Sequence, residues 1–594
     1  VIDTSKRIDQ IPEWFNGCTL NYAENLLSVN NDDKIAIFAA AEAFDDQIRR
    51  VTFRELKNQV AKYASSLKKC GVRKGDRVAA HICVCIGYMP NNVECLVAML
   101  AAVSLGAVWS STSLDFGTTA VLDRLSQVEP KILFSVEATV YNGKRHDNLH
   151  KLTKIVQGTK MKFFSIILSD FLNLADDSTV HYEQVPFNHP LFIMFSSGTT
   201  GPPKCMVHSV GGTLLKHIQE HKLQSDLGNG DVVFFYTTVG WMMWNWLVSV
   251  LAVGAAIVLY DGSPFHPRNT VLFDLASKFG VTAMGMGAKC YAVFESNGLM
   301  PIESHDLTKL RILFSTGSPL KPQSYDYIYD KIKKDVLVAS ISGGTDIVAC
   351  FIGSTWTLPV KRGYVQCPIL GCQIESWTDK AKQIFDETGE LVCTKPFPSM
   401  PTHFLNDPDF IKYKKAYFAK FQGVWAHGDF CIIDSKSGGI LMLGRSDATL
   451  NPGGVRFGSA EIYHIVESFP SIADSVCVSQ KISSCDERVV LFLKMKNKTS
   501  FTEKLENDLR TAIRNQLSAR HVPAIILAVD DIPYTNSGKK VEIAVKRVIN
   551  GESVSQIDHL ANPESLKLYY DLPQLKIDDK SFLAVVKNGR NGHS

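Results

Sequence analysis

The stretch IMFSSGTTGPPK, residues 193–204, decides the fold of this chain. It begins with a strand-like apolar run, continues with small or hydroxylated residues, and ends with two prolines and Lys204. Glycines let backbone amides approach an oligophosphate, and hydroxyls and a lysine add donors and positive charge. A flexible Ser/Gly linker is the alternative, but apolar segments bracket the run. The stretch therefore predicts a phosphate-binding loop that follows a strand.

Helical and strand-like patterns alternate along the first three-quarters of the chain. Residues 51–70 have the pattern of a helix, and residues 131–134 and 310–314 that of short strands, each close behind a helical pattern. Such alternation is typical of parallel sheets covered by helices. The predicted fold class is α/β, with a large N-terminal region of several subdomains and a small, mobile α+β domain at the C-terminus.

A chain of 594 residues is too long for one hydrophobic core. The boundary is expected near Arg445, because a glycine turn and a strand precede it and the loop 451–454 follows. From Ser459, where a helix is expected to open, to about Asn550 the pattern is that of a compact unit. We expect a large domain over 1–445, whose first 50 residues are a leading segment, and a small domain over 446–594.

Composition excludes several classes of protein. The 63 basic and 60 acidic residues give a net charge of +3, without the basic stripe of a nucleic-acid binder. The 14 cysteines contain no CxxC pair, which argues against a zinc ribbon. Scattered thiols and an N-terminus without an apolar signal peptide favour the reducing cytosol.

Residues 241–260 form an uncharged stretch of about the length that spans a bilayer. Gly254 and Ala255 divide it into a helix-length piece and a short β-branched run, and Asn245 lies within the apolar part. A buried helix followed by a buried strand is therefore expected, and an integral membrane protein is not.

Further motifs follow the phosphate loop in a fixed order. They are Ser315–Pro319, Gly343–Asp346, Trp425–Asp429, Gly444–Asp447 and Ser537–Lys539. With residues 193–204, they resemble the adenylate-forming superfamily, which includes acyl-CoA synthetases, luciferases and peptide-synthetase adenylation domains. The resemblance covers essentially the whole chain.

The resemblance implies roles for individual residues. Lys539 would be the catalytic lysine, Asp346 the magnesium ligand and Asp447 the hinge between the domains. Asp346 stands where the family usually has glutamate, one methylene longer. ATP and AMP would be bound by Ser197, Gly198, Thr199, Thr200, Gly201, Lys204, Gly317, Ser318, Pro319, Thr345, Asp429, Arg445 and Arg456.

Within the superfamily the chain resembles the acetyl-CoA-synthetase-like enzymes, and among them those that activate acetoacetate. Residues 11–25, 238–246, 341–346 and 443–457 carry this resemblance. It implies an acyl pocket lined by Trp241, Met242, Met243, Thr316 and Gly343, and CoA contacts from Lys144, Gly454 and Arg514. Gly343 replaces a tryptophan that closes the pocket around acetate, so an open floor is expected, which a tryptophan at 343 would close.

The chemistry of these residue types agrees with the resemblance. A carboxylate is a poor electrophile, and joining it to AMP supplies a good leaving group. The transition state gathers negative charge, which Lys539, Asp346 through Mg²⁺, and the Thr199–Thr200 loop would offset. The expected function is ligation of acetoacetate to coenzyme A with ATP and Mg²⁺, with small molecules as the expected partners.

Three alternatives remain open from the sequence. The first is the same chemistry on acetate, propionate or butyrate. The second is a kinase or NTPase, against which the spacing of residues 193–204 speaks, because it is not G-x-x-x-x-G-K-[ST]. The third is a membrane-embedded fatty-acid carrier, which rests on residues 241–260 alone. The oligomeric state has no signal in the sequence.

Overall fold

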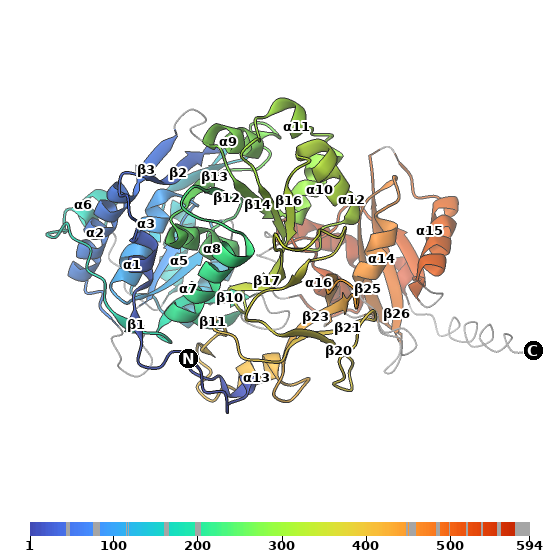
Figure 1. Cartoon of the computed structure of the whole chain (residues 1–594). Coiled ribbons are helices and arrows are strands. Elements are labelled where there is room, and N and C mark those ends of the chain that lie inside the picture. Colours follow the sequence, from blue (N-terminus) through green and yellow to red (C-terminus); the bar gives the residue numbers. More distant parts are fainter. Residues whose placement is uncertain are drawn as a thin grey trace, which may run out of the picture. The chain divides into compact units, whose positions relative to one another are not determined.

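A computed structural model gives the structure of this chain (Figure 1). The description covers residues 1–42, 48–74, 84–114, 116, 118–159, 166–196, 203–446, 450, 459–482, 487–497, 499–517, 521–535, 538–554 and 560–576. Internal contacts divide the chain into a large unit, Val1–Met442, and a small unit, Leu443–Ser594. The boundary predicted from the sequence follows Arg445.

The first main sheet of the large unit has the order β22-β11-β10-β5-β4-β6. Its strands are β4 (Val84–Tyr88), β5 (Val108–Thr112), β6 (Ile132–Ser135), β10 (Pro190–Ser196), β11 (Lys204–Ser209) and β22 (His403–Phe404). The first three and β10 are parallel, whereas β11 runs antiparallel to both its neighbours. The expected strand at residues 131–134 is confirmed as β6.

The second main sheet has the order β16-β15-β14-β12-β13-β2-β3. Its strands are β2 (Ile35–Ala41), β3 (Arg49–Thr52), β12 (Val232–Phe235), β13 (Ala256–Asp261), β14 (Ala283–Gly287), β15 (Ile312–Thr316) and β16 (Leu337–Ser340). All neighbours are parallel except β2 and β3. Strand β15 begins two residues later than expected from the sequence. The predicted parallel α/β class is confirmed.

Helices cover these sheets, as Figure 1 shows. The α-helices of the large unit are α1 (Tyr22–Leu27), α2 (Phe53–Lys69), α3 (Val93–Ser104), α4 (Thr118–Val128), α5 (Leu149–Gly158), α6 (Leu168–Leu172), α7 (Val210–Gln219), α8 (Met242–Ser249), α9 (Val271–Phe279), α10 (Ala288–Ser296), α11 (Pro301–Ser304), α12 (Pro322–Tyr327) and α13 (Ile411–Tyr417). Helix α2 begins with a capping box, because the Thr52 hydroxyl accepts from the Glu55 amide and the Glu55 carboxylate accepts from the Thr52 amide. Every residue of helix α3 except Glu94 is buried, which places the helix between layers.

Smaller sheets follow, and the last strand of one of them, β24 (Ile440–Arg445), runs across the boundary after Met442. Strands β17 (Ser342–Gly344), β18 (Ala349–Gly353) and β19 (Cys367–Pro368) form one, and β20 (Ile374–Trp377), β21 (Gly389–Cys393), β23 (Trp425–Ile433) and β24 another. Two-stranded pairs are β1 (Thr19–Leu20) with β9 (Val185–Pro186), and β7 (Ala138–Tyr141) with β8 (Lys144–Asp147).

The apolar stretch 241–260 is a buried helix followed by a buried strand, as predicted. It contains α8, the short helix η4 (Val250–Val253) and most of β13, and its residues from Met242 onward are largely inaccessible to solvent. No helix among the described residues is long and apolar enough to cross a membrane.

A buried ion pair links three elements of the large unit. Lys216 on α7 and Glu220, which opens the π-helical turn η3 (Glu220–Gln224), are 2% and 3% exposed and lie 2.8 Å apart. Glu220 also accepts hydrogen bonds from the Trp246 indole on α8 at 2.9 Å and from the Cys350 amide on β18 at 3.0 Å. Burial opposes both charges, but the partner charges outweigh it, so the pKa of Glu220 is lowered and that of Lys216 raised. Glu220 therefore ties α7, α8 and β18 together.

The small unit is a three-stranded sheet with a hydrophobic core on each face. Its strands are β25 (Ile472–Lys481), β26 (Glu487–Met495) and β27 (Ile525–Ala528), and its helices α14 (Ser459–Val466), α15 (Glu503–Gln516), α16 (Glu542–Ile549) and η8 (Pro563–Tyr569). Along β26, Val489 and Leu491 face α14 and α15, whereas Val490 and Phe492 face α16 and η8. Residues after Gly551 gave no pattern in the sequence, yet Leu566 and Tyr569 are buried in the second core.

Candidate active site

The predicted phosphate loop is flanked by two paired strands. β10 and β11 are antiparallel, and Ser196 pairs with Lys204 at their ends. Ser197, Gly198, Thr199, Thr200 and Gly201, between them, lie outside the described residues. The strand pair therefore fixes the two ends of this loop, and Lys204 is the first described side chain of the predicted set.

A polar cluster of Lys204, Asp346 and Tyr417 lies at the start of β11. The ammonium of Lys204 is 3.3 Å from Oδ1 of Asp346, and the Tyr417 hydroxyl donates to the same oxygen at 2.6 Å. Tyr417 is stacked on Trp425 with ring centroids 3.6 Å apart, which holds its hydroxyl in place. Sequence reasoning missed Tyr417. Its signal was the repeat of tyrosines at 413 and 417, one helical turn apart on α13.

Strand β23, which carries the predicted nucleotide-binding residue Asp429, lies beside the loop of the predicted magnesium ligand Asp346. On β23, Nε2 of His427 is 3.7 Å from Oδ2 of Asp429. A Cβ added at Gly344 would lie 3.6 Å from Nε2 of His427 and 3.8 Å from Oδ2 of Asp346. The loop after β17 and the start of β23, about 80 residues apart in the sequence, therefore meet in the fold.

Thr345 is fixed through its backbone. The ring of His208, on β11, donates through Nε2 to the Thr345 carbonyl at 3.1 Å. Burial lowers the pKa of His208 to about 4, so the ring is neutral at neutral pH. A neutral, buried imidazole that donates to a carbonyl is a structural support for the loop.

The predicted nucleotide-binding residues Gly317–Pro319 approach Trp241, which was predicted to line the acyl pocket. Thr316 ends β15, and Gly317, Ser318 and Pro319 follow at the carboxyl end of this parallel strand, where α/β folds bind ligands. Gly317 has φ +86°, and a Cβ added there would lie 3.7 Å from the Trp241 ring. Helix α8 follows Trp241 and begins with the buried residues Met242 and Met243.

Gly343 is surrounded differently from the expectation. A Cβ at this position would lie 2.1 Å from the Ala349 carbonyl oxygen and 2.7 Å from Cα of Cys350, both backbone atoms of β18. The pairing of β17 with β18 shifts register between Ser342 and Gly343, and this close approach needs a residue without a side chain. The expectation that a tryptophan at 343 would close the pocket floor is wrong for this backbone, because the side chain would be directed into β18.

We expect Gly343→Ala to destabilise the large unit by about 1–3 kcal/mol, since β17 and β18 must separate to admit the methyl group. Gly344→Ala is the matched control, because its Cβ would make only ordinary contacts. Chemical denaturation of both variants measures the difference. Equal free energies of unfolding for the two variants would show that β18 can move to admit the methyl group without loss of stability.

The residues predicted to bind CoA belong to different units. Lys144 is exposed on the β7–β8 hairpin of the large unit, and Arg514 is exposed near the end of α15 in the small unit. Gly454, Arg456 and the predicted hinge Asp447 lie outside the described residues. Arg445 is exposed at the end of β24.

Lys539 lies on a tight turn of the small unit. Tyr534 and Lys540 form an antiparallel bridge, the Thr535 amide donates to the Lys539 carbonyl at 2.8 Å, and the Lys539 amide donates to the Thr535 hydroxyl at 3.0 Å. Gly538 has φ +77°, the left-handed conformation that glycine adopts without strain. The Lys539 side chain is exposed.

The C-terminal tail braces the same turn. Asn562 accepts from the Tyr534 amide at 2.9 Å and donates to the Asp531 carboxylate at 2.6 Å and to the Ile532 carbonyl at 2.8 Å. Thr535 forms a bridge with Leu560. Sequence reasoning missed this contact, because a polar tail carries no periodic signal.

Comparison with known proteins places the chain. The model of the AMP-binding enzyme family matches residues 29–400, and that of the AMP-binding enzyme C-terminal domain matches residues 461–539. An acetoacetyl-CoA synthetase of Danio rerio is 54% identical over 97% of this chain and 88% of its own length. The chain belongs to the acetoacetyl-CoA synthetase family.

Distant members of the family agree. The acetoacetyl-coenzyme A synthetase of Rhizobium meliloti (strain 1021) is 44% identical over 97% of this chain and 89% of its own. The solved structure of acetoacetyl-CoA synthetase from Streptomyces lividans is 37% identical, with a TM-score of 0.88 over 97% of this chain and 89% of that one. Membership makes this chain an AMP-forming acid–CoA ligase, and the predicted family and fold are confirmed.

Proposed function

We propose that this chain joins acetoacetate to coenzyme A in two steps. An oxygen of the acetoacetate carboxylate attacks the α-phosphorus of ATP, and the bond to pyrophosphate breaks. The CoA thiol, on losing its proton, then attacks the carbonyl carbon of the acyl-adenylate, and AMP leaves. The observation that supports the proposal is the contact of Lys204, on the strand that follows the predicted phosphate loop, with Asp346. His427, the neighbour of Asp429, lies close to Gly344 in the same loop as Asp346.

In the first step, the residues of this site would offset the negative charge of the phosphates and hold ATP in position. Lys204 would offset charge on the phosphates, and Asp429 would accept hydrogen bonds from the ribose hydroxyls. The loop from Ser197 to Gly201 would donate hydrogen bonds to the phosphates. Gly317–Pro319 would contact the adenine ring. Lys539 would stabilise the charge that develops between carboxylate and α-phosphate. Thr345, Arg445 and Arg456 complete the proposed nucleotide contacts.

Asp346 has the chemistry of a magnesium ligand. Mg²⁺ binds one or two carboxylates together with substrate phosphates, so a single aspartate beside a phosphate loop suits it. Tyr417 and Lys204 hold this carboxylate in place. When bound, the ion would neutralise charge on the departing pyrophosphate.

We expect Asp346→Asn to raise the Mg²⁺ concentration needed for half-maximal adenylation at least tenfold, because an amide is a far weaker ligand than a carboxylate. Pyrophosphate release across a magnesium titration measures this. Tyr417→Phe is the control that leaves the carboxylate in place but removes its hydrogen bond, and its midpoint should shift less. An unchanged midpoint in Asp346→Asn would remove Asp346 from the metal site.

The acid is proposed from the named activity of the relatives and from the residues predicted to line the acyl pocket. Trp241, Met242, Met243, Thr316 and Gly343 would surround it, and methionines adapt to an irregular cavity. Pyrophosphate release across acetate, propionate, butyrate and acetoacetate, with and without CoA, tests the choice. Acetoacetate should have the highest kcat/KM. A higher value for acetate would favour the alternative substrate.

The second step is proposed to use another face of the small domain, 446–594. Asp447 would be the hinge that turns this domain between the steps, and Lys144, Gly454 and Arg514 would contact CoA. The location proposed for this chemistry is the cytosol, in keeping with the reduced cysteines expected from the sequence.

A further inference from the structure

The residue after the proposed catalytic lysine is a second lysine in the opposite environment. Lys539 is exposed, whereas the side chain of Lys540 is only 18% exposed and points into the small unit. Neighbouring residues of an extended chain point to opposite faces. Burial of Lys540 therefore determines the face on which Lys539 stands.

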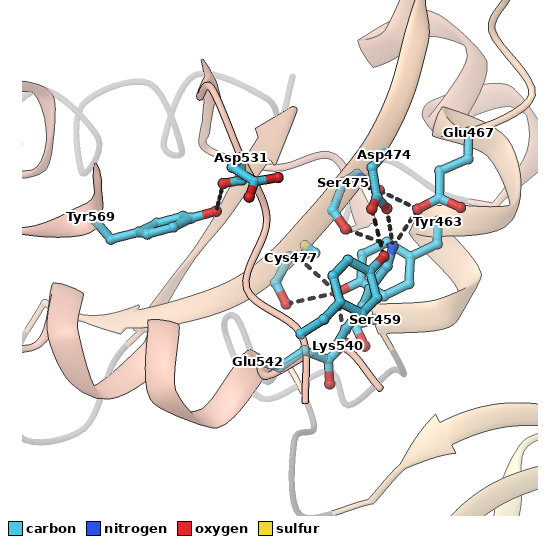
Figure 2. Close-up of polar contacts among 11 residues, drawn as sticks. Ser459, Tyr463, Glu467, Asp474, Ser475, Cys477, Asp531, Lys540, Glu542 and Tyr569 are labelled. Carbon is cyan, nitrogen blue, oxygen red and sulfur yellow. Dashed lines mark hydrogen bonds and ion pairs between the residues drawn. The ribbon is translucent and has the colours of Figure 1, made fainter. Parts of the chain in front are cut away.

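A closed set of acceptors holds the Lys540 ammonium (Figure 2). Its Nζ donates to the Glu467 carboxylate, lies 3.0 Å from Oδ1 of Asp474, and donates to the Ser475 carbonyl at 2.6 Å. It also lies 4.0 Å from the centre of the Tyr463 ring. An ammonium has three N–H donors, and these three oxygens account for all of them.

The groups around the Lys540 ammonium come from α14, the residue after it, and β25. Tyr463 is on α14, Glu467 directly follows that helix, and Asp474 and Ser475 are on β25. The far side of the cluster is also fixed, because the Tyr534 hydroxyl donates to Oδ2 of Asp474 at 2.5 Å and the Ser475 hydroxyl donates to Glu467 at 2.9 Å. Both strands of the turn, at Tyr534 and at Lys540, are thus pinned to β25 through Asp474.

Two carboxylates surround one ammonium, and this favours its charged form. Burial acts to lower the pKa of Lys540, but the charges of Asp474 and Glu467 outweigh it and raise the pKa. The anchor is therefore charged at neutral pH. A neutral side chain of similar length would fill the space but leave two buried carboxylates without their cation.

We propose that Lys540 is a positioning residue for the reaction: its buried ammonium, held by Glu467, Asp474 and Ser475, fixes the turn that presents Lys539. The inference rests on the function proposed for Lys539. Lys540 contacts no substrate in this account and acts only through its neighbour. Small displacements of a charged group from its place in the transition state are costly, so loss of the anchor should impair adenylation selectively.

The test is a double-mutant cycle on the full-length enzyme. We expect Lys540→Met to lower kcat for acetoacetate-dependent pyrophosphate release roughly ten- to hundredfold, with KM for ATP within about twofold. Thioester formation from a preformed acyl-adenylate should stay near that of the unmodified enzyme. In a Lys539→Ala background, Lys540→Met should add little further loss, because the group that it positions is already absent.

Controls separate positioning from a general structural effect. Lys546→Met removes another partly buried lysine of the same unit, ion-paired with Glu487 at 3.9 Å, and should leave both half-reactions unchanged. If Lys540→Met does not fold, Glu467→Gln removes one charge from the acceptors at nearly constant shape and should give a smaller loss with the same selectivity. Circular dichroism and thermal unfolding establish that each variant is folded.

The outcomes distinguish this inference from the function on which it rests. If the rate losses of Lys540→Met and Lys539→Ala multiply in the double variant, the two residues act independently and Lys540 is not a positioning residue. The same conclusion follows if Lys540→Met lowers the rates of both half-reactions equally. If Lys539→Ala alone leaves adenylation intact, the proposed function of Lys539 fails instead. The inference would also be overturned if Glu467→Gln and Lys540→Met were both folded and both kept the adenylation rate of the unmodified enzyme.

Discussion

Lys539→Ala is expected to lower the rate of adenylation roughly 10²- to 10³-fold, because it removes a preorganised cation from a transition state rich in negative charge. Thioester formation from preformed acyl-adenylate should largely survive, since the resemblance implies that this lysine serves the first step alone. Pyrophosphate release and CoA-ester formation from added adenylate measure the two steps separately. An equal fall in both would contradict the assigned role.

Glu220→Ala is expected to destabilise the large unit by about 3–5 kcal/mol, because it leaves the Lys216 ammonium buried without its carboxylate. It also removes the acceptor for the Trp246 indole and the Cys350 amide, so α8 and β18 lose a shared anchor. Chemical denaturation of the folded enzyme and the variant gives the difference in free energy of unfolding.

Asp326→Ala is the matched control for Glu220→Ala. Asp326 pairs with Arg362 at the surface, where both side chains are about half exposed. Exposed ion pairs contribute less than about 1 kcal/mol, because water screens them. If Glu220→Ala costs no more than Asp326→Ala, the buried pair does not anchor α8 and β18 as described.

Much of the fold could be predicted because local patterns and tertiary structure agree. The buried helix and strand in residues 241–260 followed from the break at Gly254, which has φ +77° in the structure. The parallel strands β6 and β15 followed from short apolar runs behind helical patterns. Element bounds shifted by a few residues, because the ends of strands depend on pairing with distant neighbours.

The features that were missed are tertiary ones. The hydrogen bond of Tyr417 with Asp346, the bracing of the Lys539 turn by Asn562, and the burial of Lys540 all join residues whose local sequence is unremarkable in pattern. Gly343 illustrates the opposite error. The resemblance predicted an open pocket floor at Gly343 that a tryptophan would close. Whether a side chain fits at 343 depends on the close approach of β18, which the sequence alone does not reveal.

The residues of the proposed mechanism come from both units. The large unit carries Lys204, Asp346 and Asp429, and the small unit carries Lys539 on an anchored turn. We therefore expect adenylation to depend on residues of both units, and thioester formation to follow it. A reaction through an acyl-phosphate would release ADP in place of AMP, and it would have no adenylation step for Lys539 to serve.

The most direct test of the central claim is acetoacetate-dependent exchange of labelled pyrophosphate into ATP in the absence of CoA. Exchange requires that the carboxylate and ATP form an acyl-adenylate and pyrophosphate reversibly at this site. We expect exchange with acetoacetate and Mg²⁺, none without the acid, and its loss in Lys539→Ala. Absence of exchange in a folded enzyme that still makes the CoA ester, or release of ADP in place of AMP, would contradict the account.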